Sequence, residues 1–141
     1  MNWAEADLIY MAATMDCEGA IVISKRTRCN SYELWIGVSN MREALPLWLK
    51  STFGGRYNKM NASGNRKDYF IWYLHANKAV EILRAIRPYL KLKQEEVDIA
   101  IEYQETVKAR GAFPYSNLEH ELQSILYEQL KLLHVRKGGY D

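Results

Sequence analysis

The chain has 141 residues, of which 48% are hydrophobic, and this is enough for one domain with a buried core. No apolar run approaches the length of a membrane span and no basic-then-apolar leader precedes Trp3, so the sequence predicts a soluble intracellular protein, in cytoplasm or an organelle, without a membrane partner. Cys17 and Cys29 are too few for a disulfide framework or a zinc site, and we expect both to be small buried residues.

The charge is distributed unevenly along the chain, although the net charge is only +2. Residues 21–75 contain nine Lys and Arg against three Asp and Glu, which gives this segment +6 and leaves −4 for the remainder. Such an asymmetry indicates that one face of the protein binds a polyanion.

The first predicted helix spans residues 3–16. Its apolar residues recur at helical spacing and form a core-facing stripe of Leu8, Met11, Ala12 and Met15. Ala13 and Cys17 lie beside the stripe, and small side chains at this spacing allow a second helix to approach closely. Asp16 and Glu18 fall at the helix C-terminus, where the macrodipole disfavours negative charge. A compensating cation is therefore expected nearby.

A strand pair is predicted next, because the apolar pattern changes to period two after the helix. Gly19 is expected to permit a sharp exit that a residue with a Cβ would resist. Ile21 and Ile23 face one way, and residues 32–38 return the chain with alternate apolar residues on the same side. The opposite side carries basic and polar residues. This alternation predicts a hairpin with one apolar and one cationic face.

A second helix and a second hairpin follow. Ser39 or Asn40 is expected to cap the helix, and Gly54-Gly55 to end it. Residues 56–60 and 68–74 form the next strand pair, with Phe70, Trp72 and Leu74 expected on the core side.

Three more helices are predicted in the second half of the chain. The first spans residues 77–86 before Pro88, and the second residues 91–105. The last begins near Ser116 and carries apolar residues at helical spacing, namely Leu118, Leu122, Ile125, Leu126, Leu130 and Leu133. The predicted order is αββαββααα, which is an α+β fold.

Residues 11–19 read Met-Ala-Ala-Thr-Met-Asp-Cys-Glu-Gly and closely resemble the motif of the LAGLIDADG homing endonucleases. Three further landmarks occur in the family's order and spacing, namely Gly54-Gly55, Trp72 and residues 87–94. The resemblance covers about residues 5–105. It implies a single LAGLIDADG-type domain over residues 1–141, with an αββαββα core, a saddle-shaped antiparallel sheet and a C-terminal helical extension at residues 106–141.

The resemblance also implies a metal-dependent catalytic site. Glu18 matches the acidic position that holds Mg²⁺ or Mn²⁺, with Glu in place of the commoner Asp, and hard oxygen ligands suit these ions. Asn40 and Lys93 match positions near the scissile phosphate, although a helix N-cap would explain Asn40 equally well. A basic residue found in some relatives is Ala44 here, so one supporting cation has no counterpart. Asp16 is expected to make structural hydrogen bonds at the helix interface.

The candidate DNA-binding residues lie on the two basic hairpins. Arg and Asn make bidentate contacts with guanine and adenine edges, while other cations contact phosphate. The candidates are Ser24, Arg26, Arg28, Trp35, Arg56, Asn58, Arg66 and Lys67. A solvated strand face is the plainer interpretation for Lys59 and Lys67. His75, His120 and His134 show no metal-ligand spacing and are expected to be ordinary surface or core residues.

Because the chain contains one motif, the resemblance implies a homodimer that pairs through Ala12, Ala13 and Asp16. The implied activity is site-specific cleavage of double-stranded DNA at a long pseudo-palindromic site. One alternative is a non-cleaving nucleic-acid binder, either an intron RNA maturase or a transcription regulator. A second alternative is a helical interaction module whose motif match is accidental, which the +6 central segment disfavours.

Overall fold

A computed structural model describes residues 2–26, 31–61, 63–65, 67–107 and 117–137. Its helices and strands are, in chain order, α1 (Glu5–Glu18), β1 (Gly19–Arg26), β2 (Ser31–Asn40), α2 (Ala44–Phe53), β3 (Arg56–Met60), β4 (Tyr69–His75), α3 (Ala76–Ile86), a short 3₁₀ helix (Arg87–Tyr89), α4 (Gln94–Glu105) and α5 (Asn117–Lys137). The predicted α+β class and the αββαββα core with added helices are confirmed. None of the helices in these ranges is long and apolar enough to cross a membrane.

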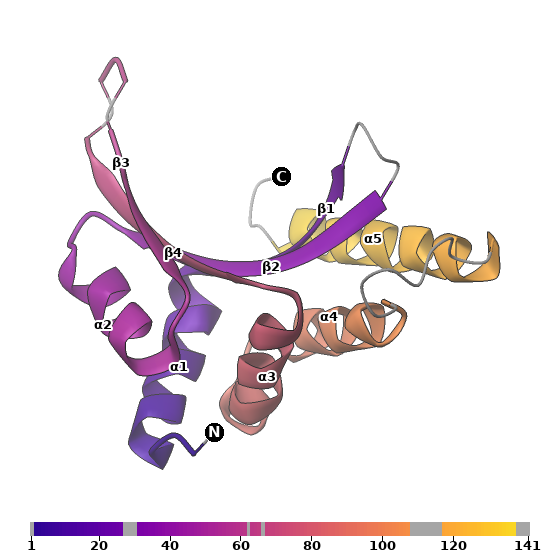
Figure 1. Cartoon of the computed structure of the whole chain (residues 1–141), viewed down its shortest axis with the longest axis horizontal. Helices are drawn as coiled ribbons and strands as arrows, with labels where there is room; N and C mark the ends of the chain where they lie inside the picture. Colours follow the sequence, from indigo (N-terminus) through magenta and orange to yellow (C-terminus); the bar gives the residue numbers. More distant parts are fainter. Residues whose placement is uncertain (1, 27–30, 62, 66, 108–116, 138–141) are drawn as a thin grey trace.

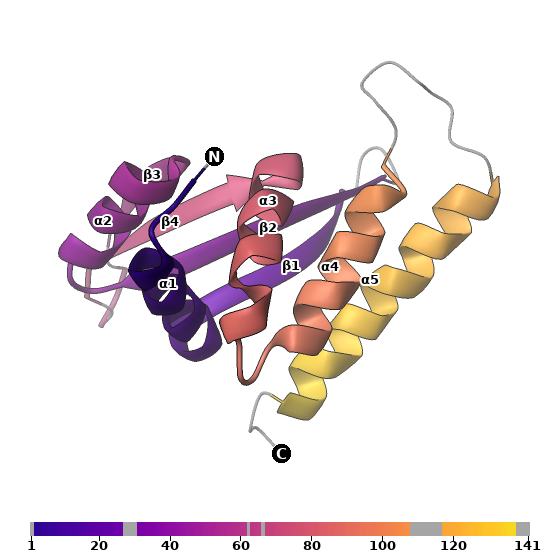
Figure 2. The same ribbon diagram turned by 90° about the horizontal axis from the view of Figure 1, so that it is seen from below.

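The strands form one antiparallel sheet in the order β1-β2-β4-β3. The first strands of the two hairpins therefore lie at the edges, and β2 pairs with β4 in the centre. Figure 1 shows that the sheet curves upward at both ends and that the helices lie beneath it. Figure 2, seen from below, shows the same helices in front of the sheet, with α5 beside α4 at one end. No helix of the described residues lies on the concave face of the sheet (Figure 1).

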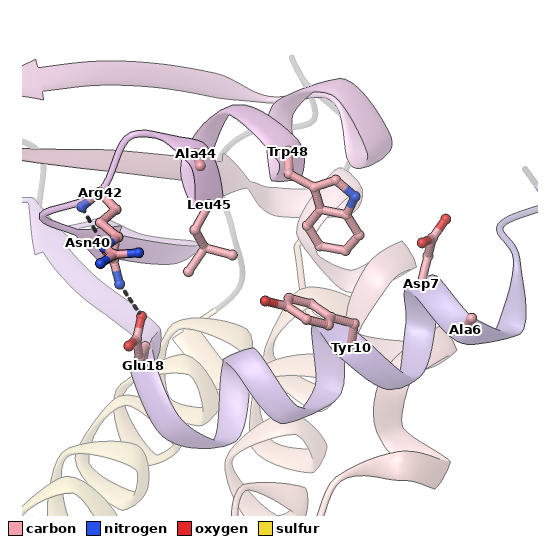
Figure 3. A pocket seen from close by; sticks show the side chains of 9 residues that line it. All are labelled: Ala6, Asp7, Tyr10, Glu18, Asn40, Arg42, Ala44, Leu45 and Trp48. Atoms are coloured by element: carbon pink, nitrogen blue, oxygen red, sulfur yellow. Dashed lines mark hydrogen bonds between the residues drawn. The ribbon is translucent and has the colours of Figure 1, made fainter.

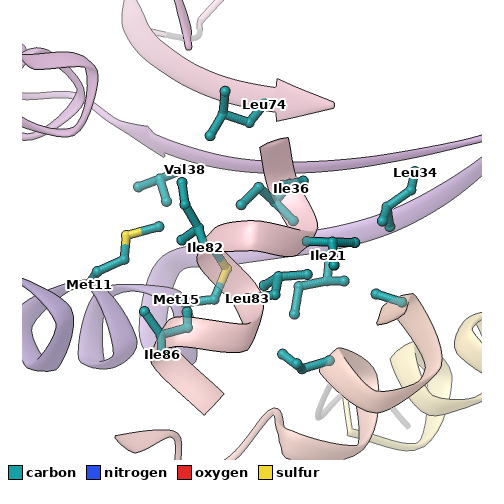
Figure 4. Close-up of a cluster of buried hydrophobic side chains, with 14 of the residues drawn as sticks. Met11, Met15, Ile21, Leu34, Ile36, Val38, Leu74, Ile82, Leu83 and Ile86 are labelled. Carbon is teal, nitrogen blue, oxygen red and sulfur yellow. The ribbon is translucent and has the colours of Figure 1, made fainter. Parts of the chain in front are cut away.

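The hydrophobic core lies between the sheet and the helices, and alternate strand residues supply it because side chains of a strand point to opposite faces. From the sheet come Ile21, Ile23, Leu34, Ile36, Val38, Trp72 and Leu74, and from α1 and α3 come Met11, Met15, Ile82, Leu83 and Ile86 (Figure 4). The predicted core face of β4 is confirmed by Trp72 and Leu74. Phe70 is partly buried on the same face, where its ring stacks on Tyr57.

The predicted glycine stop after α2 is confirmed and has a clear backbone reason. Gly54 and Gly55 have φ values of 77° and 97°, which residues with a Cβ rarely adopt. The Gly54 carbonyl accepts a hydrogen bond of 2.7 Å from the Trp72 indole N–H. The end of α2 is thereby tied to the centre of the sheet.

One prediction about the later helices, the start of α4, was wrong in detail. Helix α4 begins at Gln94 and not at residue 91, because the preceding N–H groups bind a carboxylate of α1. On α5, Leu126 and Leu130 are buried, but Leu118 and Ile125 are 76% and 48% exposed. This helix packs against α4 and β1 through a narrower stripe than its apolar pattern indicates.

Candidate functional site

The C-terminus of α1 meets the end of β2 at two of the predicted site residues. Glu18 is the last residue of α1, and Asn40 is the last residue of β2. Asn40 Nδ2 donates a hydrogen bond of 2.8 Å to Glu18 Oε2, and Asn40 Oδ1 accepts one of 2.8 Å from the Arg42 N–H. Figure 3 shows this chain of contacts. Both ends of the Asn40 amide are engaged, which holds the exposed Glu18 carboxylate in one orientation.

The expectation that Ser39 or Asn40 caps α2 was wrong. Both residues belong to β2, and α2 begins at Ala44 after Glu43, without a side-chain cap. The Asn40 side chain instead accepts a hydrogen bond from the Arg42 N–H, in the short turn between β2 and α2. Asn40 therefore does not act as the N-cap of α2, and its contact with Glu18 favours a role in the site.

Glu18 and Asn40 line an open groove of about 720 Å³ between α1 and α2. Tyr10 and Trp48 also line it, and their rings meet edge to face at a centroid distance of 5.0 Å. Arg42 also lines the groove, and the sequence interpretation did not select it. Its position two residues after Asn40, in a turn, was the available signal. Ala44 lines the same groove.

Lys93 supplies the cation that the C-terminus of α1 was expected to need. Its Nζ donates hydrogen bonds to the main-chain carbonyls of Met15, at 2.9 Å, and of Gly19. These are terminal carbonyls of the kind that a helix leaves without partners. Burial lowers the pKa of Lys93, while Glu96 and Asp16 act in the opposite direction. The ammonium group is therefore directed at the main chain on both sides of Glu18.

Asp16 makes structural hydrogen bonds, but its partners lie within the chain and not at the expected interface between two motif helices. Its carboxylate accepts hydrogen bonds from the N–H groups of Lys91, Leu92 and Lys93, at 2.7, 3.1 and 3.1 Å. Charge-assisted bonds of this kind are about twice as strong as neutral ones. They join the motif helix to the segment that precedes α4.

The exposed side of α1 differs in part from the predicted dimer surface. Ala12 is fully buried in the chain's own core, so its side chain does not face a second copy. Ala13 is exposed, as expected, and Ile9 beside it is 47% exposed. Cys17 was expected to be buried but is exposed, because it lies on the side of α1 that carries Ala13. Cys29 lies outside the described residues.

Gly19 was expected to permit a sharp turn, and the structure gives a different reason for glycine. Its φ and ψ of −83° and 155° are ordinary strand values that any residue adopts. A Cβ at this position would instead lie 2.1 Å from Met15 Sδ and 2.7 Å from Met15 Cα. The absent side chain therefore lets β1 start directly against the last turn of α1.

The concave face of the sheet brings together the described candidates from the two hairpins. The register places Ser24, Arg26, Trp35, Arg56 and Asn58 opposite the core side. Lys67 is exposed just before β4, and Arg28 and Arg66 lie outside the described residues. Lys59 lies on the other face and pairs with Asp68 at 3.6 Å.

Three residues of the concave face were missed as candidates. Tyr73 accepts a hydrogen bond of 3.0 Å from Asn58 Nδ2 through its hydroxyl oxygen. Glu33 and His75 lie 3.0 Å apart on neighbouring strands. His75 had been expected to be an ordinary residue, because a lone His shows no spacing signal. Only the register of β2 and β4 reveals the contact.

No family model and no curated protein matches the sequence, but solved structures match the fold. The match with the homing endonuclease I-CvuI in complex with its target has a TM-score of 0.73 and 16% identity, and covers 91% of this chain and 82% of that one. The LAGLIDADG meganuclease I-AabMI bound to uncleaved DNA matches with a TM-score of 0.65 and 13% identity, over 92% of this chain and 49% of that one. The chain has the fold of the LAGLIDADG homing endonucleases. The group I intron-encoded homing endonuclease I-CeuI, complexed with DNA, matches this LAGLIDADG fold with a TM-score of 0.68 and 14% identity. The match covers 92% of this chain and 68% of that one.

On this LAGLIDADG fold, one exposed carboxylate stands at the end of the motif helix, that of Glu18. Within the described ranges, no group of three or more His, Cys, Asp and Glu side chains is arranged to hold a metal ion. Mg²⁺ prefers oxygen ligands and commonly uses one or two carboxylates together with substrate phosphate and water. Glu18 therefore fits a metal whose other ligands come from outside the chain.

Proposed function

We propose that the chain is a site-specific DNA endonuclease that uses a divalent metal and acts as a homodimer on a long pseudo-palindromic duplex. The observation that carries this proposal is the placement of Glu18 and Asn40. They lie together at the end of the motif helix, where α1 passes directly into the sheet whose concave face carries the basic hairpin residues. Solved structures with this fold were determined in complex with DNA, which supports the same partner here.

Glu18 would hold Mg²⁺ or Mn²⁺ against the DNA backbone. When bound, such an ion polarises the phosphoryl group and lowers the pKa of water, which makes hydrolysis faster. Asn40 fixes the orientation of the Glu18 carboxylate through its 2.8 Å hydrogen bond. Lys93 positions the same carboxylate from the other side, because it binds the carbonyls of Met15 and Gly19.

The homodimer follows from what one chain lacks. One chain offers a single motif and, among its described residues, one exposed carboxylate at the end of α1, whereas two strands must be cut. The exposed side of α1 carries Ile9, Ala13 and Cys17, which are apolar or small enough for close helix packing. The match with I-AabMI uses 92% of this chain but 49% of that chain, which leaves room there for a second unit of similar size.

We assign the phosphate-binding cation of the site to Arg42. It lines the groove with Glu18, whereas the ammonium group of Lys93 is directed at main-chain carbonyls. Arg42→Ala is expected to slow single-turnover cleavage by about a hundredfold at saturating DNA, because one preorganised donor to the transition state is lost. Lys50→Ala, which removes an exposed cation of α2 outside the groove, should leave the rate unchanged. Equal rates for both variants would contradict the assignment.

The proposed activity is tested by incubating a randomised duplex library with the protein and sequencing both cut and bound molecules. Mg²⁺ is expected to yield double-strand cuts at one near-palindromic sequence, and EDTA is expected to abolish them. Enrichment of bound duplexes without cuts in Mg²⁺ or Mn²⁺ would reject the nuclease and identify a DNA-binding regulator. Absence of both binding and cutting would reject duplex DNA as the partner, and the same assay with structured RNA would then test the maturase.

A further inference from the structure

We propose that Arg26, Glu33 and His75 form a base-reading cluster that recognises one G·C pair in each half of the DNA site. The proposal rests on the proposed DNA-binding function and adds two specificity-determining residues, Glu33 and His75. We call these three residues the Arg-Glu-His cluster.

The cluster spans three neighbouring strands of the sheet. Arg26 of β1 lies 3.0 Å from Glu33 Oε2, and His75 Nδ1 of β4 lies 3.0 Å from Glu33 Oε1. Glu33 belongs to β2, between the other two strands. The register pairs Glu33 with Ser24 and His75 with Trp35, so the cluster shares the concave face with these two DNA-binding candidates. The ring of Tyr73 meets that of His75 edge to face at 5.5 Å, which restrains the imidazole.

Glu33 is a fixed carboxylate on a face that also carries the cations Arg26 and Arg56. Burial alone would raise its pKa, but the hydrogen bonds and charges of Arg26 and His75 hold the pKa of Glu33 below its usual value. The group therefore remains ionised at neutral pH. An ionised carboxylate repels DNA phosphates, so its place on this face is explained best by a contact with a hydrogen-bond donor of the DNA.

Both base pairs present a donor beside acceptors in the major groove, and the pairing preferences of Glu and Arg select G·C. In the major groove, cytosine presents the N4 amino group as a donor, and guanine presents O6 and N7 as acceptors. Glutamate accepts from cytosine N4 and arginine donates to guanine, so Glu33 and Arg26 are complementary to the two bases of one pair. Because each carboxylate oxygen already has one partner in the protein, Glu33 meets the DNA in a preset orientation.

The test is target selection from a randomised duplex library, read as bound sequences, with the whole chain and its variants. The wild-type protein is expected to select G·C at one symmetric pair of positions. Glu33→Gln should reduce that preference about tenfold at those positions only, since one good base contact is lost. It should also raise the affinity for unrelated DNA, because a negative charge leaves the surface. His75→Ala should weaken the same preference less strongly.

Asp68→Asn is the matched control, since it removes a carboxylate of the other exposed pair on the hairpins, with Lys59. It should leave the preference at the cluster positions unchanged. The inference is overturned if Glu33→Gln weakens binding to all sequences equally, or changes preference no more than Asp68→Asn does. Thermal unfolding of each variant shows whether a uniform loss of binding comes from misfolding. If Glu33→Gln is misfolded, the base preference of His75→Ala provides the independent test. If the wild-type protein selects no duplex at all, the proposed function itself fails.

Discussion

Glu18→Gln is expected to reduce DNA cleavage by about a thousandfold or more while leaving DNA binding intact. The substitution keeps the size of the side chain and removes the charge that would hold the metal. Asn40 would still bind the remaining carbonyl oxygen, so the end of α1 should keep its geometry. Single-turnover cleavage in Mg²⁺ measures the first effect, and binding of the same duplex in Ca²⁺ measures the second.

Glu18→Asp is the matched variant, because it keeps the charge and shortens the side chain by one methylene. It should cleave measurably, and Mn²⁺ should restore more activity to it than to Glu18→Gln. A Glu18→Gln protein that cleaves at the wild-type rate would place the catalytic carboxylate elsewhere. Loss of binding in the same variant would show that Glu18 acts in the structure and not in the reaction.

Asp16→Ala is expected to lower the free energy of unfolding by about 3 kcal/mol, because three N–H groups lose a charged acceptor. These groups belong to residues 91–93, so α4 should lose its attachment to the motif helix. Asp16→Asn retains one acceptor oxygen and should lose about half as much. Urea unfolding followed by circular dichroism measures both values.

Asp98→Ala is the control for this prediction. Asp98 forms two hydrogen bonds with Arg87, at 2.5 and 2.8 Å, but both side chains are largely exposed. Exposed ion pairs contribute less than about 1 kcal/mol. If Asp98→Ala destabilised the protein as much as Asp16→Ala, the attachment of residues 91–93 would not be the cause.

Much of the fold was predictable because its signals are local. The apolar stripe of α1, the period-two pattern of the hairpins and the glycines after α2 each depend on residues close together in the sequence. The start of α4 was not predictable in this way. It depends on Asp16, about 75 residues earlier, which takes the N–H groups that a longer helix would use.

The candidate site was predictable only in part, for a related reason. The motif selected Glu18, and the resemblance selected Asn40, but the hydrogen bond between them depends on how β2 ends beside α1. Arg42, Glu33 and His75 were missed because their significance arises from contacts between strands or with a groove. The exposure of Cys17 was missed because the spacing of Ala13 and Cys17, four residues apart, is the same on a buried and on an exposed side of a helix.

The alternation along the strands places core residues and open-face residues in the same segments. In β1, Ile21 and Ile23 belong to the core, whereas Val22 and Ser24 face the open side. In β4, Trp72 and Leu74 alternate in the same way with Tyr73 and His75. On the proposed function, mutations at the open-face positions would alter which sequence is recognised at little cost to folding. Gly37 is an exception, because a Cβ there would lie 3.2 Å from the Trp72 carbonyl oxygen. Through the other open-face positions, a lineage could acquire a new target without first losing its stability.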